Sequence, residues 1–137
     1  MKYVIVPAKN EEKNIAKTIK SLQLSIADKI LVVVNGSTDG TSKIVTDLLN
    51  NKVEMIHFTD QLGYDVPRAI GAYYAFLDGG EYGVFVDGDM TELTYCIIDD
   101  IFYRLKEEYL DMLLVDSLDK LGDNIDKNIL ASYIGQF

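Results

Sequence analysis

Five short segments of the chain are almost continuously apolar and rich in β-branched residues. They comprise residues 3–6, 30–34, 53–58, 82–86 and 112–115. A strand with one face in water alternates apolar and polar residues, whereas the strands of a parallel sheet are covered on both faces and read as unbroken apolar runs. The five segments therefore predict a parallel sheet that is buried on both sides.

The stretches between these segments carry apolar residues at helical spacing. They predict helices over residues 10–24, from about residue 38 to residue 49, over residues 66–78 and over residues 93–105. In the first of these helices, Asn10 is the expected N-cap, and Glu11 and Glu12 are expected in the first turn. Strands that alternate with helices predict an α/β fold, an open doubly wound, mostly parallel sheet with helices on both faces.

A length of 137 residues predicts one domain, residues 1–137, with its core in residues 1–118. The tail, residues 119–137, predicts a C-terminal amphipathic helix. Its apolar stripe comprises Ile129, Leu130, Tyr133, Ile134 and Phe137. Such a stripe needs cover from its own sheet or from a second copy of the chain, and we expect a homodimer through this helix.

The composition narrows the range of partners. The chain has 22 acidic and 13 basic residues, a formal net charge of −9, and nucleic acid is not an expected partner because backbone binding needs a positive surface. The longest aliphatic run is far shorter than the roughly 20 residues that span a bilayer, so no transmembrane segment is expected. The single cysteine, Cys96, favours a cytoplasmic protein. We expect Cys96 in the core and His57 packed within its strand.

The segments that follow the strands are the place to look for a ligand, because open α/β sheets bind ligands outside the carboxyl ends of their strands. These segments are residues 7–11, 35–41, 59–68, 87–89 and those from 116 onward. They contain neither the Gly-x-Gly-x-x-Gly fingerprint nor the Gly-x-x-x-x-Gly-Lys-Ser/Thr motif. The sequence therefore disfavours dinucleotide dehydrogenases and P-loop NTPases.

The most distinctive local motif is Asp87-Gly88-Asp89, directly after a predicted strand. Two carboxylates so close together repel each other, and no Lys or Arg lies nearer in the sequence than Arg68 and Arg104. A hard divalent cation, Mg²⁺ or Mn²⁺, suits such a pair, because it takes one or two carboxylates and fills its shell with water and substrate phosphates. The alternative is a solvated Asp-Gly turn.

Four segments together resemble the family 2 glycosyltransferases, whose nucleotide-binding half has the GT-A fold. They are VIVPAKNEEKNI at residues 4–15, VVVNGSTDGTSKIV at 32–45, GYDVPRAIGA at 63–72 and GEYGVFVDGDM at 80–90. The segments occur in the order and at the spacing of that family, over about the first two thirds of the chain. The resemblance implies a metal-dependent glycosyltransferase-type domain that binds a nucleotide-diphospho-sugar and transfers the sugar to an acceptor.

The resemblance also implies roles for individual residues. Asp87-Gly88-Asp89 corresponds to the family's metal-binding Asp-x-Asp, in which the last carboxylate ligates the ion and the first reaches the sugar or ribose. Pro7, Ala8 and Glu11 match the first loop that cradles the nucleotide. Arg68 matches a basic residue beside the nucleotide, and a cation in the first turn of a helix suggests a nearby anion.

The chain departs from the family pattern in two ways. It has Val34-Asn35 where the family has a pair of acidic residues, the second of which contacts the base, and an amide both donates and accepts hydrogen bonds. Family members also continue into an acceptor-binding half that supplies the catalytic base. We therefore expect this sequence to cover mainly the nucleotide-binding half, and no catalytic base is assigned.

Other interpretations remain open at this stage. Residues 36–41 suit a structural turn and helix cap, and Glu11 and Glu12 could serve only to complement a helix N-terminus. A module that binds a nucleotide sugar without transferring it is the main alternative function. A phosphoacceptor receiver domain is disfavoured because residues 7–12, PAKNEE, lack its acidic pair. A sugar nucleotidyltransferase is disfavoured because its Gly-rich, Arg-containing first loop is missing.

Overall fold

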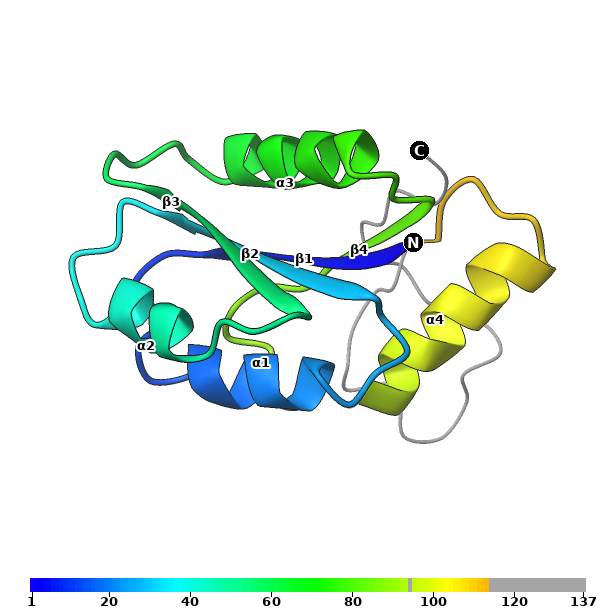
Figure 1. Cartoon of the computed structure of the whole chain (residues 1–137), viewed down its shortest axis with the longest axis horizontal. Coiled ribbons are helices and arrows are strands. Elements are labelled where there is room, and N and C mark those ends of the chain that lie inside the picture. Colours follow the sequence, from blue (N-terminus) through cyan, green and yellow to red (C-terminus); the bar gives the residue numbers. More distant parts are fainter. Residues whose placement is uncertain (94, 114–137) are drawn as a thin grey trace.

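The computed structural model describes residues 1–93 and 95–113 and forms one parallel sheet between two layers of helices (Figure 1). In chain order the elements are β1 (Lys2–Ala8), α1 (Ile15–Leu22), β2 (Lys29–Asn35), α2 (Thr41–Asp47), β3 (Val53–Phe58), α3 (Asp65–Leu77), β4 (Tyr82–Phe85) and α4 (Tyr95–Glu107). The strands lie in the order β3-β2-β1-β4 and all neighbours are parallel. The predicted α/β fold is confirmed.

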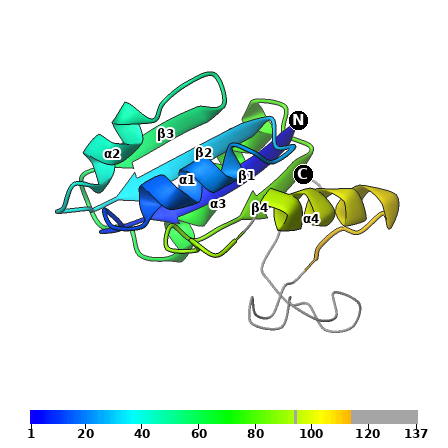
Figure 2. The same ribbon diagram turned by 90° about the horizontal axis from the view of Figure 1, so that it is seen from below.

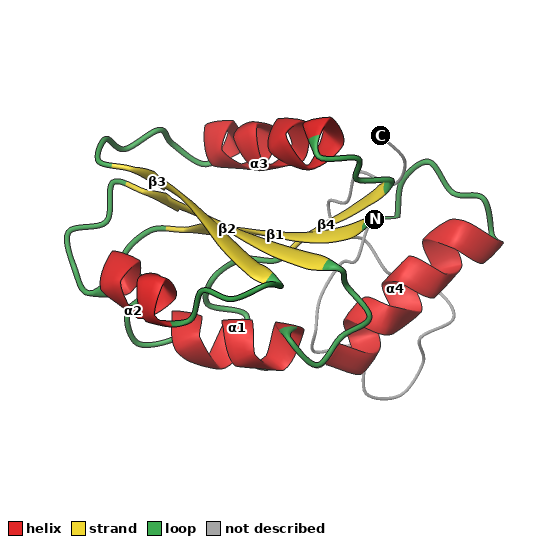
Figure 3. Cartoon of the chain, viewed as in Figure 1, coloured by secondary structure: helices red, strands yellow, loops and turns green. Residues whose placement is uncertain are grey.

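Alternate residues of the strands pack into two separate cores. Val4 and Val6 of β1 face α1, α2 and α4, whereas Tyr3 and Ile5 face α3. Figure 3 shows α3 alone on one side of the sheet, and Figure 2 shows the helices of the other side. The central strands are thus covered on both faces, which explains their unbroken apolar runs.

The first predicted helix begins later than its sequence suggests. Asn10 has φ +54°, and helix α1 begins at Ile15, after a turn in which the Glu11 carbonyl accepts the N–H groups of Asn14 and Ile15 at 3.0 and 2.9 Å. Asn10 is therefore not the N-cap, and Glu11 and Glu12 precede the helix. The predicted apolar face is confirmed, since Ile15, Ile19 and Leu22 are buried.

Two predicted burials are wrong. Cys96 is exposed, because the buried face of α4 comprises Ile98, Ile101, Phe102 and Leu105 and Cys96 lies off that stripe. His57 is exposed because β3 is an edge strand and the seven-residue helix α2 is too short to cover its whole length.

The C-terminal expectations are tested only in part. Met112 and Leu113 are not in a strand, contrary to the prediction for residues 112–115. The amphipathic helix over residues 119–137, and the homodimer through it, lie outside the described residues. Within the described ranges, no helix combines the length and apolar character needed to cross a membrane.

Candidate functional site

The carboxyl ends of the strands, at the left of Figure 1, border a pocket of about 300 Å³. Its lining residues are Pro7, Ala8, Lys9, Glu11, Asn35, Gln61, Gly63, Tyr64, Arg68, Asp87, Gly88 and Asp89. All eight residues that the sequence singled out as a candidate site are among them. Lys9, Gln61, Gly63 and Tyr64 were not singled out individually, although each lies in or beside a segment that follows a predicted strand.

One wall of the pocket is built by two loops that hydrogen-bond to each other. The backbone N–H of Glu11 donates to Thr41 Oγ1 at 2.8 Å, and that of Thr38 donates to Asn10 Oδ1 at 2.8 Å. The Glu12 carboxylate accepts the N–H of Gly40, the N-cap of α2, at 2.9 Å. Residues 36–41 therefore brace the loop that carries Glu11, and Glu12 complements the N-terminus of a different helix from the one expected.

The opposite wall is the segment between β3 and α3. The N–H of Leu62 donates to Asn35 Oδ1 at 3.2 Å, and Asn35 is only 4% exposed. Gly36 has φ +62°, and a Cβ atom there would lie 2.7 Å from the Cα of Gln61. Only glycine lets the two backbones approach this closely. Asn35 and Gly36 thus hold Gln61 and its neighbours against the end of β2.

Arg68 and Asp87 form an ion pair at the edge of the pocket. Arg68 Nη1 also donates to the carbonyl oxygen of Tyr64 at 2.8 Å, so the guanidinium joins the loop to the end of β4. The side chains of Arg68 and Asp87 are 26% and 47% exposed. The expectation that the two aspartates lack a cationic neighbour is therefore wrong for Asp87. In the described part of the chain, the Asp89 side chain has no hydrogen bond or ion pair.

Gly88 places the two aspartates. Its carbonyl oxygen accepts Thr18 Oγ1 at 2.9 Å, and a Cβ atom at position 88 would lie 3.2 Å from Glu11 Cγ and 3.4 Å from Ala8 Cβ. A larger residue would push this strand end away from α1 and the first loop. Gly88 therefore packs Asp87 and Asp89 against the pocket.

The donor set of the pocket fits a divalent cation that is completed by a ligand. Glu11, Asp87 and Asp89 bring three carboxylates and Lys9 and Arg68 two cations, which leaves one negative charge in excess. Among the residues that the structure describes, no group of three or more His, Cys, Asp or Glu side chains is placed to hold a metal ion. The carboxylates of Asp87, paired with Arg68, and of the unpaired Asp89 remain as candidate ligands for Mg²⁺ or Mn²⁺, which take the rest of their shell from water and phosphate.

Comparison with known proteins identifies the family of this chain. The sequence model of Glycosyl transferase family 2 matches residues 3–112, most of the chain. The chain belongs to this family. The match includes every residue that lines the pocket.

Curated relatives are longer than this chain. An uncharacterised protein of Methanocaldococcus jannaschii is 37% identical over 89 residues, which cover 62% of this chain and 38% of the relative. The UDP-N-acetylglucosamine–dolichyl-phosphate N-acetylglucosaminyltransferase of Methanococcus voltae is 46% identical over 46 residues, 34% of this chain and 18% of the relative. The matched segments thus cover less than half of either protein.

Solved structures share the fold. Staphylococcus aureus TarS superposes with a TM-score of 0.68 at 28% identity, over 83% of this chain and 21% of TarS. Glucosyl-3-phosphoglycerate synthase from Mycobacterium tuberculosis, solved with Mn²⁺, UDP and glucosyl-3-phosphoglycerate, superposes with a TM-score of 0.67 at 21% identity, over 85% of this chain and 43% of the synthase. The latter similarity concerns the fold alone.

Proposed function

We propose that this chain is the donor-binding part of a glycosyltransferase and binds a nucleotide-diphospho-sugar in the pocket at the strand ends. The observation that carries the proposal is the convergence of Asp87, Asp89 and Arg68 on one pocket. Carboxylates that can share a divalent cation, next to a guanidinium that can bind phosphate, are complementary to a metal-bound diphosphate.

Each group has a distinct role in the proposal. Asp89 and Asp87 hold Mg²⁺ or Mn²⁺, and the bound ion supplies positive charge that stabilises the leaving nucleoside diphosphate. Arg68 binds a phosphate oxygen, and Pro7, Ala8 and Glu11 form the wall against which the nucleotide lies. Gly88 lets the strand end that carries both aspartates lie close to Ala8 and Glu11. The sugar is transferred to an acceptor hydroxyl.

The relatives support a uridine nucleotide as the first donor to test. The Methanococcus voltae relative is named for UDP-N-acetylglucosamine, and the Mycobacterium tuberculosis synthase was solved with UDP and Mn²⁺.

The one cysteine in the sequence offers no intramolecular disulfide, which favours the cytoplasm as the location.

Calorimetric titration of UDP into the chain, with and without Mn²⁺, tests the proposal. We expect UDP to bind only with Mn²⁺ present and Asp89→Asn to weaken this binding. Loss of a residue that merely supports a metal ligand lowers affinity roughly 10- to 100-fold, and loss of Asp89, a direct ligand in this proposal, should lower it further. Asp111→Asn is the matched control, because it removes the same charge from an exposed residue outside the pocket. An Asp89→Asn affinity equal to that of the parent would show that the motif is only a turn.

A nucleotide-sugar-binding module without transfer is the second candidate function. The segments that match the two relatives above cover 38% and 18% of those proteins. Incubation with labelled UDP-sugars, Mn²⁺ and a panel of acceptor alcohols distinguishes the two candidate functions. Labelled product or free UDP supports the enzyme, whereas tight binding without either supports the module.

A further inference from the structure

We propose that Thr18 and Ser21 of α1 are positioning residues, whose hydroxyl groups hold Asp87 and Asp89 in the orientation in which these carboxylates bind a divalent cation. The inference rests on the proposed function and deepens it, because it identifies the groups that aim the two aspartates at the pocket. Neither Thr18 nor Ser21 lines the pocket, so both would act through the backbone that carries the aspartates.

The segment that carries the aspartates lies beyond the hydrogen bonds of the sheet. Among the described residues, β4 has a neighbouring strand on one side only, and its last backbone bond to β1 joins the Val86 N–H to the Ile5 carbonyl at 3.0 Å. From residue 87 to residue 93, the backbone–backbone bonds within the described part of the chain are local, such as the 3.0 Å bond from the Met90 N–H to the Asp87 carbonyl. The sheet therefore does not determine how this segment lies against the rest of the domain.

Helix α1 supplies hydrogen bonds that do determine it. Thr18 Oγ1 donates to the carbonyl oxygen of Gly88 at 2.9 Å, and Ser21 Oγ donates to the carbonyl oxygen of Leu93 at 2.9 Å. The two donors are three residues apart, so they lie on the same side of the helix. The first bond holds the peptide group that joins Gly88 to Asp89, and the second holds the far end of the segment.

Thr18 is a polar residue on an otherwise apolar helix face. The buried residues of α1 are Ile15, Thr18, Ile19 and Leu22, and Thr18 is only 1% exposed. Valine has the same branched shape and would pack there without a hydroxyl that needs a partner. Threonine hydroxyls inside helices often bond to the carbonyl one turn earlier, whereas the Thr18 hydroxyl donates to Gly88, 70 residues away in the sequence. Packing alone does not account for this hydroxyl.

A fixed Gly88 peptide fixes Asp89 in particular. Gly88 is buried, and without the Thr18 hydroxyl its carbonyl would lose its side-chain donor and would turn to find another, because buried backbone groups need partners. Asp89 would move with this peptide. Arg68 would still hold Asp87 through their ion pair, but the Asp89 side chain has no hydrogen bond or ion pair of its own in the described part of the chain. The pair of carboxylates would then no longer be directed at one cation.

The experiment measures the Mn²⁺ affinity of the chain by calorimetry in the presence of UDP. We expect Thr18→Val, which keeps the packing but not the hydroxyl, to weaken Mn²⁺ binding about tenfold or more, as when a group that supports a metal ligand is removed. Thr18→Ser loses a buried methyl group but keeps the hydroxyl, so it should bind Mn²⁺ as the parent does, even where it is less stable to urea.

Ser25→Ala is the matched control. It removes another buried hydroxyl that donates to a backbone carbonyl, that of Leu22 at 2.6 Å, and Ser25 lies outside the pocket. We expect this variant to lose stability in urea and to retain the Mn²⁺ affinity of the parent. Loss of a buried hydroxyl is thereby separated from loss of the bond to Gly88.

The outcomes separate this inference from the proposed function. If the parent binds Mn²⁺ with UDP and Thr18→Val binds them equally well, the inference is wrong and the proposed function stands. Equal losses of affinity in Thr18→Val and Thr18→Ser would show that Thr18 acts through packing alone, and the inference would again be wrong. If the parent binds neither ligand, the proposed function fails and the inference fails with it.

Should Thr18→Val not fold, Ser21→Ala decides. Ser21 is only partly buried, so its truncation disturbs the core less while it removes the bond to Leu93. Weaker Mn²⁺ binding in Ser21→Ala supports the inference, and an affinity equal to that of the parent overturns it.

Discussion

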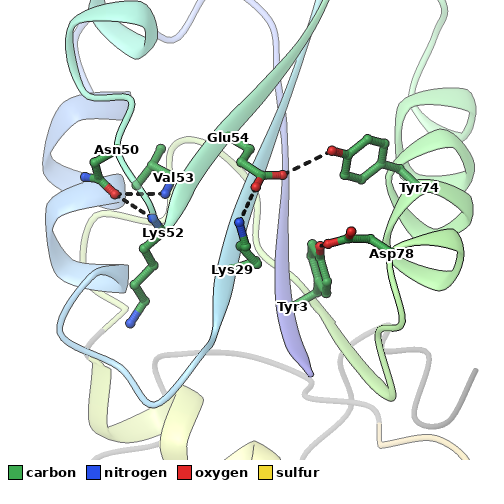
Figure 4. Close-up of polar contacts among 8 residues, drawn as sticks. All are labelled: Tyr3, Lys29, Asn50, Lys52, Val53, Glu54, Tyr74 and Asp78. Atoms are coloured by element: carbon green, nitrogen blue, oxygen red, sulfur yellow. Dashed lines mark hydrogen bonds and ion pairs between the residues drawn. The ribbon is translucent and has the colours of Figure 1, made fainter.

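A group of polar side chains lies beneath α3, at the amino ends of the strands (Figure 4). This polar network comprises Tyr3, Lys29, Glu54, Tyr74 and Asp78. Lys29 pairs with Glu54, Tyr74 Oη donates to Glu54 at 3.2 Å, and the hydroxyl of the fully buried Tyr3 donates to Asp78. Burial and the Asp78 carboxylate both raise the pKa of the Tyr3 hydroxyl above its usual value of 10.0. The network lies at the opposite end of the sheet from the pocket, so we assign it to stability.

Tyr3→Phe should lower the free energy of unfolding at neutral pH by about 1.5–3 kcal/mol, the loss of a hydrogen bond to a charged acceptor. Because the folded-state pKa of Tyr3 is raised, the parent should also lose stability as the pH rises above 10.0, where the unfolded tyrosine ionises. The variant should lose less over the same pH range. Urea unfolding at about pH 8 and about pH 11 measures both effects. Tyr109→Phe, at a residue 87% exposed, is the control, and equal pH dependence in all three proteins would contradict the assignment.

Arg68 offers a test of function at the residue scale. Arg68→Ala removes a partly exposed ion pair, so we expect a stability loss of no more than about 1 kcal/mol, but a clear loss of affinity for UDP and Mn²⁺. Arg104→Ala is a matched control, because Arg104 also pairs with a carboxylate, Glu108, has a side chain 25% exposed, and lies outside the pocket. Thermal unfolding and calorimetry measure the two effects. A large stability loss with unchanged affinity would assign Arg68 to structure alone.

Helix α3 packs closely on β1 through Gly71. A Cβ atom at position 71 would lie 2.4 Å from Cγ2 of Ile5, a fully buried side chain. Gly71→Ala gains about 1 kcal/mol of helix propensity, but we expect a net loss of stability because overpacking costs about 1–3 kcal/mol. Ile5→Leu moves the branch away from Cβ, so Gly71→Ala should cost less in that background. Urea unfolding of the double-mutant cycle measures the coupling, and additive effects would show that Ile5 is not the obstacle.

The elements could be predicted from local pattern where burial follows from the chain itself. The four described strands coincide closely with apolar runs, because a parallel sheet buries both faces of its strands. The start of α1 could not be predicted this way, because Asn10 is held at φ +54° by contacts with residues 37 and 38, which are distant in sequence. The exposure of His57 depended in the same way on the length of α2 and on the place of β3 at the edge of the sheet, and that of Cys96 on which face of α4 packs against the core.

The site residues that lie at the carboxyl ends of strands could be predicted from the sequence. Pro7, Asn35 and Asp87 lie at or just beyond the carboxyl ends of three strands, and this rule brings them together. Tyr64 and Gln61 lie in a loop whose path depends on the contacts of Asn35 with Leu62 and of Gly36 with Gln61. Those contacts are tertiary, and the only signal in the sequence was that the loop follows a strand.

The groups that we assign to stability and those that we assign to binding lie at opposite ends of the strands. The polar network, which includes the buried Tyr3, lies at the amino ends, and the pocket lies at the carboxyl ends. Between the two ends, the central strands β1 and β2 have neighbouring strands on both sides and helices on both faces. Ligand binding at the carboxyl ends should therefore leave the structure at the amino ends unchanged.

Hydrogen exchange tests this separation in the complete chain. In the absence of ligand we expect the amides of β1 and β2 to exchange most slowly, because opening them requires disrupting both cores. With UDP and Mn²⁺, slower exchange should appear in residues 59–64 and 87–89, at the pocket, and not in residues 78–81, at the amino ends of the strands. Asp89→Asn should abolish the change, and Asp111→Asn should retain it. Equal protection at both ends of the strands would mean that the ligand stabilises the fold as a whole. The proposed independence of the two ends would then be wrong.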